Sequence, residues 1–227
     1  MSLILNIETA TDICSICISR NEETLIIKEA DKEYSHTAEI TVLIQGCCAE
    51  AGITLNQLDA VAVSEGPGSY TSLRVGASTA KGICYALDKP LIAINTLQSI
   101  AATTIKNKKL DAYYAPMIDA RRMEVYTSLF DKDMNIILDT HAKIIDEHSF
   151  QDFFEDGHKI IFSGNGAPKC QNAIKSFHAI FSSEICSAAN LVSLSFLAFQ
   201  NKDFSDAAYF SPSYFKSPNI TIPRKTL

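Results

Sequence analysis

The amino-acid sequence predicts an α/β fold of two lobes, in which mixed sheets are flanked by helices. Three strand-like runs at the N-terminus are followed by the alternation helix, strand, helix, strand, which is typical of α/β architecture. A second set of strand-like runs begins after a polar, lysine-rich spacer at residues 106–109. The chain has 227 residues, of which 47% are hydrophobic and 20% are charged. That length can bury a core in one large domain or two small ones.

The first lobe is expected over residues 1–105. Its first three runs alternate apolar and polar residues between polar turns, which predicts an antiparallel meander with the first strand in the centre. The predicted elements are strands at 3–7, 13–19 and 25–29, a helix at 35–51 that ends at Gly52, a strand at 58–64, a helix at 70–87 and a strand at 91–94. This order is that of ribonuclease H-like units, which actin-like domains share.

The second lobe is expected over residues 106–227 and has a less regular pattern. We predict strands at 112–118, 124–130, 135–138 and 160–162, a turn at 164–166, and helices at 167–178 and 189–199. The segment 209–218 is aromatic and interrupted by proline, so it is expected to lie extended over the body, with the C-terminal segment packing back on the first lobe.

A glycine-rich turn joins the strand at 58–64 to the helix at 70–87. Glycines at two of its positions permit positive φ and close backbone approach, the proline between them fixes φ, and Ser69 or Thr71 is expected to cap the helix. A strand, a glycine turn and a helix start also form an anion cradle, but Thr71 stands where the dinucleotide fingerprint has its third glycine. A structural turn is the favoured interpretation and a nucleotide contact is the alternative. The residues concerned are Gly66, Pro67, Gly68, Ser69, Tyr70 and Thr71.

The two long helices each carry a second strip of small or apolar residues, opposite the face that would cover a sheet. Small residues in a row allow another helix to approach closely. A tolerated surface is the alternative, since isolated exposed alanines and valines are ordinary. The occurrence of strips on both helices favours a partner interface. Its predicted members are His36, Ala38, Val42, Gln45, Ala49, Val75, Ser78, Thr79, Gly82 and Ala86.

Charge and cysteine content limit the classes of function. The formal net charge of −6 argues against a broad basic face for nucleic acid, so any RNA is expected to be reached through another chain. The 7 cysteines are scattered among apolar residues, which predicts buried thiols in a reduced, cytoplasmic protein. No apolar run approaches the length of a membrane span.

No catalytic constellation stands out. The five histidines show no metal-binding spacing, and Ser69 lacks the nucleophile elbow. Glu8 and Asp119 each follow a predicted strand and could form a carboxylate pair around a metal. The rival function is therefore an actin-like phosphotransferase or ATPase with Glu8 as metal anchor, which calorimetry with ATP and magnesium would distinguish from a binding protein.

Several segments together resemble the landmarks of the TsaB (YeaZ) family. The most specific is Gly-Pro-Gly-Ser-Tyr-Thr-Ser-Leu-Arg-Val-Gly at 66–76, and the others lie at 4–10, 36–39, 95–97, 119–126 and 212–214. The resemblance implies a two-lobed actin-like fold in a non-catalytic partner of TsaD. That partner acts with the ATPase TsaE in making threonylcarbamoyladenosine at position 37 of tRNAs. Without TsaD, the two strips are expected to pair two copies of this chain into a homodimer. The resemblance also implies that tRNA is reached only through the complex, and that ATP or ADP and a metal reside on the partner proteins.

Two departures from the family pattern and one from its paralogue bear on activity. Glu8 stands where the family usually has Asp, and Ser72 where it usually has Gly. Thr96 and Ile100 are at the positions that resemble the two metal-binding histidines of TsaD. Neither side chain replaces an imidazole as a ligand, so we expect no catalytic residue, metal or cofactor in this chain.

Overall fold

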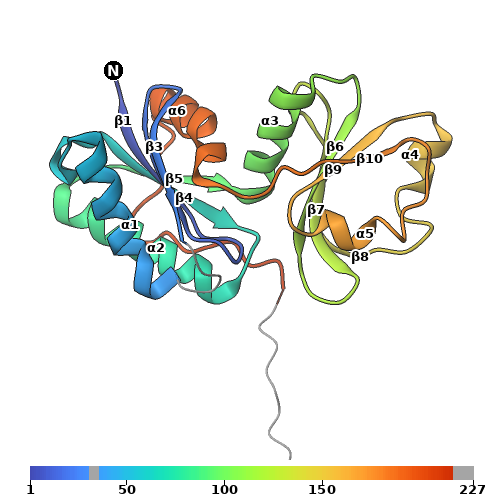
Figure 1. The fold of residues 1–227 in the computed structure, drawn as a ribbon, viewed down its shortest axis with the longest axis horizontal. Coiled ribbons are helices and arrows are strands. Elements are labelled where there is room, and N and C mark those ends of the chain that lie inside the picture. Colours follow the sequence, from blue (N-terminus) through green and yellow to red (C-terminus); the bar gives the residue numbers. More distant parts are fainter. Residues whose placement is uncertain (31–35, 217–227) are drawn as a thin grey trace, which may run out of the picture.

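The computed structural model describes residues 1–30 and 36–216 and has two lobes, each built on a five-stranded sheet (Figure 1). The first sheet has the order β3-β2-β1-β4-β5. Its strands are β1 (Leu3–Glu8), β2 (Ser15–Arg20), β3 (Glu23–Glu29), β4 (Ala60–Gly66) and β5 (Leu91–Asn95). β1 pairs antiparallel with β2 and parallel with β4, which confirms its predicted central place.

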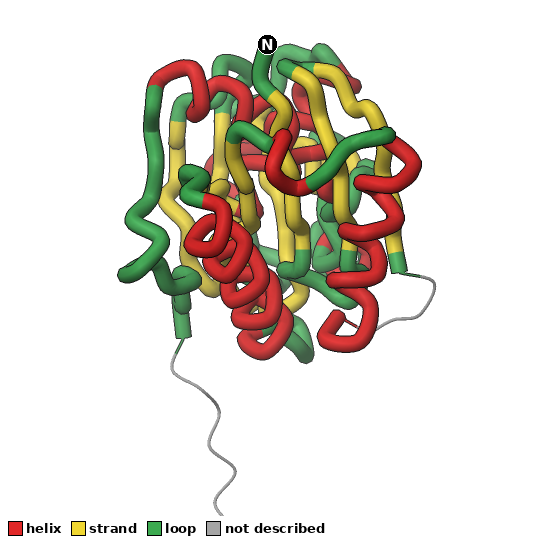
Figure 2. The backbone as a smooth tube through the Cα atoms, turned by 90° about the vertical axis from the view of Figure 1, so that its left-hand side faces the viewer, coloured by secondary structure: helices red, strands yellow, loops and turns green. Residues whose placement is uncertain are grey.

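Helices cover both faces of the first sheet. The helices α1 (His36–Ala51) and α2 (Tyr70–Leu87) pack side by side on one face, over a core of alternate strand residues such as Leu5, Ile7 and Val61. The opposite face, with Ile4 and Ile92, is covered by α6 (Val192–Asn201) and by the short helix η2 (Ala188–Leu191). Figure 2 shows helices lying in front of the strands, as expected for a sheet buried between helical layers.

The second sheet repeats the order of the first. Its strands are β6 (Tyr113–Asp119), β7 (Glu124–Phe130), β8 (Ile136–Ile144), β9 (Ile160–Ser163) and β10 (Ala179–Phe181), and they lie in the order β10-β9-β6-β7-β8. From its other end the order is β8-β7-β6-β9-β10, so β6 occupies the place of β1. The first three strands of each sheet are antiparallel and the last two join parallel. Two ribonuclease H-like units in tandem are the actin-like architecture that the sequence predicted.

Two helices connect the lobes by crossing over. The helix α3 (Thr96–Lys108) follows β5 of the first sheet but packs on β6 of the second sheet. Conversely, η2 and α6 follow β10 of the second sheet and pack on β1 and β5 of the first. The helix that succeeds each sheet therefore contributes to the other lobe, which ties the two together (Figure 1).

The predicted elements differ from the structure mainly around α5 (Ala167–Cys170) and α3, and the short elements α4 (Gln151–Glu155) and β10 were not predicted. The helix expected at 167–178 is only α5, because the chain must turn back for β10 to pair with β9. The helix α3 was not predicted, although Asn95 caps it by accepting from the N–H groups of Leu97 (3.0 Å) and Gln98 (3.1 Å). The remaining short helix is η1 (Leu55–Gln57).

Two further predictions concern the cysteines and the membrane. All seven cysteines are free and buried, which confirms the expectation of buried thiols. Burial raises the pKa of the Cys14 thiol to about 12, so this thiol is unreactive. In the described part of the chain, every helix is too short or too polar to span a bilayer.

Candidate functional site

The glycine turn is held against two other parts of the chain by close backbone packing. Gly66 has φ 112°, and a Cβ there would lie 2.8 Å from the carbonyl oxygen of Ser213. A Cβ at Gly68 would lie 2.4 Å from the carbonyl oxygen of Ala10, and the N–H of Ser69 donates to that same oxygen at 2.7 Å. Because packing within the chain already requires both glycines, a phosphate ligand is not needed to explain them.

The start of α2 differs from the predicted cap. Ser69 is the N-cap residue, but its side chain accepts from no helix N–H group. Its hydroxyl instead accepts from the hydroxyl of Ser72 at 2.9 Å. Thr71 lies inside the helix and is exposed. The expectation that either side chain caps α2 was therefore wrong, because the Ser69 hydroxyl bonds to the hydroxyl of Ser72 and Thr71 follows the N-cap inside the helix.

A polar cavity of about 470 Å³ lies between the lobes. The first lobe lines it with residues 10–12 and 67–71, and the second lobe with residues 118–121, Tyr126 and Asn165. Residues 213–216 form the rest of its wall. Of the predicted turn residues, Pro67, Gly68, Ser69, Tyr70 and Thr71 line this inter-lobe cleft, whereas Gly66 is buried behind them.

Glu8 and Asp119 have different partners. Glu8 is fully buried, its Oε1 accepts from the N–H of Ala10 at 2.6 Å, and its Oε2 has no hydrogen-bond partner among the described residues. Burial raises the pKa of the Glu8 carboxyl to about 7, although hydrogen bonds from Ala10, Ser64 and Thr9 act in the opposite direction. Asp119 lies 2.5 Å from Lys169 Nζ. Within residues 1–30 and 36–216, no group of three His, Cys, Asp or Glu side chains could hold a metal ion.

The outer faces of α1 and α2 carry the predicted partner residues. Ala38, Val42, Gln45, Ala49, Ser78, Gly82 and Ala86 are exposed, and Val75 and Thr79 are partly buried. Val42 is 62% exposed although it is apolar. His36 is buried, with a pKa lowered by desolvation, so the structure does not bring it to the outer face with the others.

Among residues 1–30 and 36–216, neither the backbone conformation nor the packing around position 82 requires a glycine. A Cβ built on it meets no atom within 4 Å, and its backbone is helical. Glycine in a helix interior costs about 1 kcal/mol relative to alanine, so alanine would stabilise the isolated chain. A glycine that the fold does not need is expected where another backbone approaches closely from outside.

Two exposed aromatic side chains near these faces were not predicted from the sequence. Tyr85 is 91% exposed on α2, three residues after Gly82 and therefore its neighbour on the helix surface. Tyr209 is 87% exposed in the segment that Lys81 of α2 holds, since Lys81 Nζ donates to the carbonyl oxygens of Ala208 (3.1 Å) and Phe210 (2.9 Å). Exposed tyrosines are frequent in interfaces, but a search for small residues does not find them.

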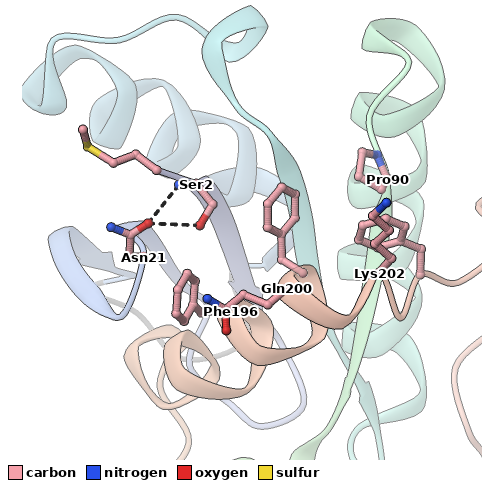
Figure 3. Close-up of a pocket in the computed structure, with 9 residues that line it drawn as sticks. Ser2, Asn21, Pro90, Phe196, Gln200 and Lys202 are labelled. Atoms are coloured by element: carbon pink, nitrogen blue, oxygen red, sulfur yellow. Dashed lines mark hydrogen bonds between the residues drawn. The ribbon is translucent and has the colours of Figure 1, made fainter.

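A second cavity, of about 520 Å³, lies at the opposite end of the first sheet (Figure 3). Phe196, Phe199, Phe204 and Pro90 give it a mostly apolar wall. Ser2 and Asn21 lie at its edge, where the N–H of Ser2 donates to the side-chain oxygen of Asn21 at 2.9 Å. None of the predicted functional residues lines this cavity.

The two positions that the resemblance to TsaD compares with metal-binding histidines lie in the core. Thr96 and Ile100 are both fully buried on α3, and Ile100 belongs to a hydrophobic cluster with Ile118 and Cys186. That cluster joins α3 to the second sheet. The side chain of Ile100 thus contributes to packing between elements.

Comparisons with known proteins agree on one family. The model described as "TsaD: tRNA N6-adenosine threonylcarbamoyltransferase" matches residues 29–221. TsaB of Haemophilus influenzae, a tRNA threonylcarbamoyladenosine biosynthesis protein, is 38% identical over 126 residues, which cover 55% of this chain and 52% of that protein. A tRNA N6-adenosine threonylcarbamoyltransferase of Bacillus anthracis is 32% identical over 110 residues, 41% of this chain and 32% of that protein. The chain spans about half the length of the curated TsaB relatives it matches.

A solved structure has the same fold over nearly the whole chain. YeaZ from Pseudomonas aeruginosa superposes with a TM-score of 0.80 at 22% identity, and the match covers 94% of this chain and 100% of that one. The likeness extends over both lobes and agrees with the repeated sheet order described above.

Proposed function

Because the chain belongs to the family described as TsaD, tRNA N6-adenosine threonylcarbamoyltransferase, we propose that it is a non-catalytic subunit for threonylcarbamoylation of tRNA. The curated relatives named TsaB, at 28–38% identity, support this role. The proposed reaction transfers the threonylcarbamoyl group to N6 of adenosine 37, and a TsaD-type partner carries the chemistry. We place this activity in the cytoplasm.

The side chains at two positions support a non-catalytic role. In the resemblance to TsaD, the metal-binding histidines correspond to Thr96 and Ile100, and neither a hydroxyl nor an alkyl side chain replaces an imidazole as a metal ligand. Glu8, the candidate metal anchor, is buried and accepts a hydrogen bond from the chain's own backbone at Ala10. ATP or ADP and the metal are accordingly assigned to the partner proteins.

The observation that carries the proposed docking surface is Gly82, which has open space where its side chain would be. We propose that the outer faces of α1 and α2 pack against the matching helices of TsaD in a four-helix contact. TsaE joins the resulting complex, and tRNA is bound only through it. Without TsaD, the same faces pair two copies of this chain, since one surface patch can be self-complementary in a two-fold dimer.

Replacing Tyr85 with alanine is expected to weaken binding to the TsaD partner about tenfold, because exposed tyrosines at an interface centre supply much of the binding energy. Tyr85 is 91% exposed in the free chain, so its removal should leave the fold intact. Titration calorimetry with the purified partner measures the effect. Phe177→Ala is the matched control, since Phe177 is 97% exposed and lies in the second lobe. Equal affinities for both variants would contradict the proposed surface.

A further inference from the structure

The segment after α6 runs along the first lobe and ends between the lobes. The N–H of Ser205 donates to the carbonyl oxygen of Leu91 at 2.8 Å, and Lys81 of α2 then holds the chain at Ala208 and Phe210. Pro212 is buried, and the N–H of Ser213 donates to the carbonyl oxygen of Glu65 at 2.7 Å. The chain is thus anchored to the glycine turn just before it reaches the inter-lobe cleft.

The next two residues contact opposite lobes. The Tyr214 ring lies 4.7 Å from the ring of Tyr70 on α2, in the first lobe. The Phe215 ring lies 6.4 Å from the ring of Tyr126 on β7, in the second lobe. The rings of Tyr214 and Phe215 thus face opposite lobes, and two adjacent aromatic residues reach across the cleft from one backbone.

A third contact strengthens the end on the second lobe. Lys216 Nζ forms an ion pair with Glu124 Oε2 at the start of β7. Ser213, Tyr214, Phe215 and Lys216 all line the inter-lobe cavity, so this segment is a wall of the cleft as well as a contact between its sides.

We propose that residues 213–216, the C-terminal strap, fasten the two lobes together across the mouth of the inter-lobe cleft and control its opening. The covalent connections between the lobes run through α3 and through the segment before η2. The strap adds a non-covalent tie that can be released. This inference concerns the chain itself and stands whether or not the proposed function holds.

The two ends of the strap differ in strength, which decides where it opens. At the end on the first lobe, the N–H of Ser213 donates a backbone hydrogen bond to Glu65. The carbonyl oxygen of Ser213 also lies so close to Gly66 that a Cβ on residue 66 would be only 2.8 Å from it. The end on the second lobe has one aromatic contact and an ion pair whose side chains are 40% and 22% exposed. Exposed ion pairs are weak, so the strap detaches from the second lobe first and the cleft widens on that side.

The test measures the distance between the lobes by double electron–electron resonance. Asn56→Cys in the first lobe and Asp152→Cys in the second provide exposed labelling sites, while the seven native cysteines are buried. In the protein labelled at these two positions, the double substitution Phe215→Ala and Lys216→Ala is expected to shift the inter-lobe distances to longer values and to broaden their distribution. The matched control is the pair Phe177→Ala and Lys175→Ala, which also removes one exposed phenylalanine and one exposed lysine. Identical distributions for both pairs would overturn the proposal.

A second readout follows the strap itself. The chain contains no tryptophan, so Phe215→Trp places a single tryptophan against Tyr126, and its emission can be excited selectively over that of the tyrosines. Combined with Glu124→Gln, which removes the ion pair to Lys216, acrylamide quenching of this tryptophan is expected to rise only slightly, because an exposed ion pair is weak. Quenching as strong as in the urea-unfolded chain, before Glu124 is replaced, would mean that the strap does not lie against the second lobe.

Discussion

Replacing Gly82 with leucine is expected to lower the affinity for the TsaD partner at least about 100-fold, a loss of about 2.7 kcal/mol. The side chain would occupy the space that the proposed partner helix fills, because small residues are what allow two helices to approach closely. In the free chain the same position is open, with no atom within 4 Å of a Cβ. The substitution should therefore leave the isolated protein folded and separate binding from stability.

Two variants serve as controls for Gly82→Leu. Ser193→Leu adds an exposed leucine to α6, away from the docking surface, and should bind the partner normally. Gly82→Ala should raise the thermal unfolding midpoint of the free chain, since alanine is favoured over glycine in a helix by about 1 kcal/mol. Copurification of Gly82→Leu with the partner at the level of Ser193→Leu would contradict the proposed contact.

The stability of the free chain is expected to fall as pH rises, because of Glu8. Its pKa is about 7 in the folded state, against 4.5 for a glutamate side chain in water. The folded state therefore binds the proton more tightly than the unfolded state between these values, and ionisation is favoured in the unfolded state. The contribution of protonated Glu8 to stability is fully present below about pH 4.5 and is lost as the pH rises through about 7. The free energy of unfolding then falls by an amount on the order of 3 kcal/mol.

Urea unfolding of the wild type and of Glu8→Gln at several pH values measures this effect. The amide cannot ionise, so the variant should lack the decrease due to Glu8. His36 acts with the opposite sign, since burial lowers its pKa and favours the folded state as pH rises. The difference between the two proteins isolates Glu8, and parallel pH profiles would show that its carboxyl is not perturbed by burial.

The first lobe was predictable because its signals are local. Alternating apolar residues determine β1, β2 and β3, and the glycine turn fixes where β4 ends and α2 begins. The outer strips on α1 and α2 follow from helical periodicity alone. Helical periodicity placed His36 on the outer face, but the side chain is buried. Its burial depends on the packing of the start of α1 against the segment around Thr11 and Ile13, whose backbone groups form hydrogen bonds with His36.

The parts that the sequence did not predict depend on contacts distant in the chain. The early end of α5 follows from the pairing of β10 with β9, and the packing of α3 on the second sheet follows from the crossover between lobes. Glu8 is fully buried close to Ser64 and Cys186, which are far from it in sequence. Likewise, the two aromatic residues of the strap gain their role only from the facing rings of Tyr70 and Tyr126.

Reconstitution of tRNA modification tests the central claim most directly. TsaD, TsaE, ATP, tRNA and an activated threonylcarbamoyl donor are combined with no further protein, with this chain, or with its Gly82→Leu variant, and threonylcarbamoyladenosine is quantified after digestion. The proposed role predicts modification with the wild-type chain, little without it or with the variant, and none when this chain replaces TsaD. Equal modification in the presence and absence of the chain would contradict the account.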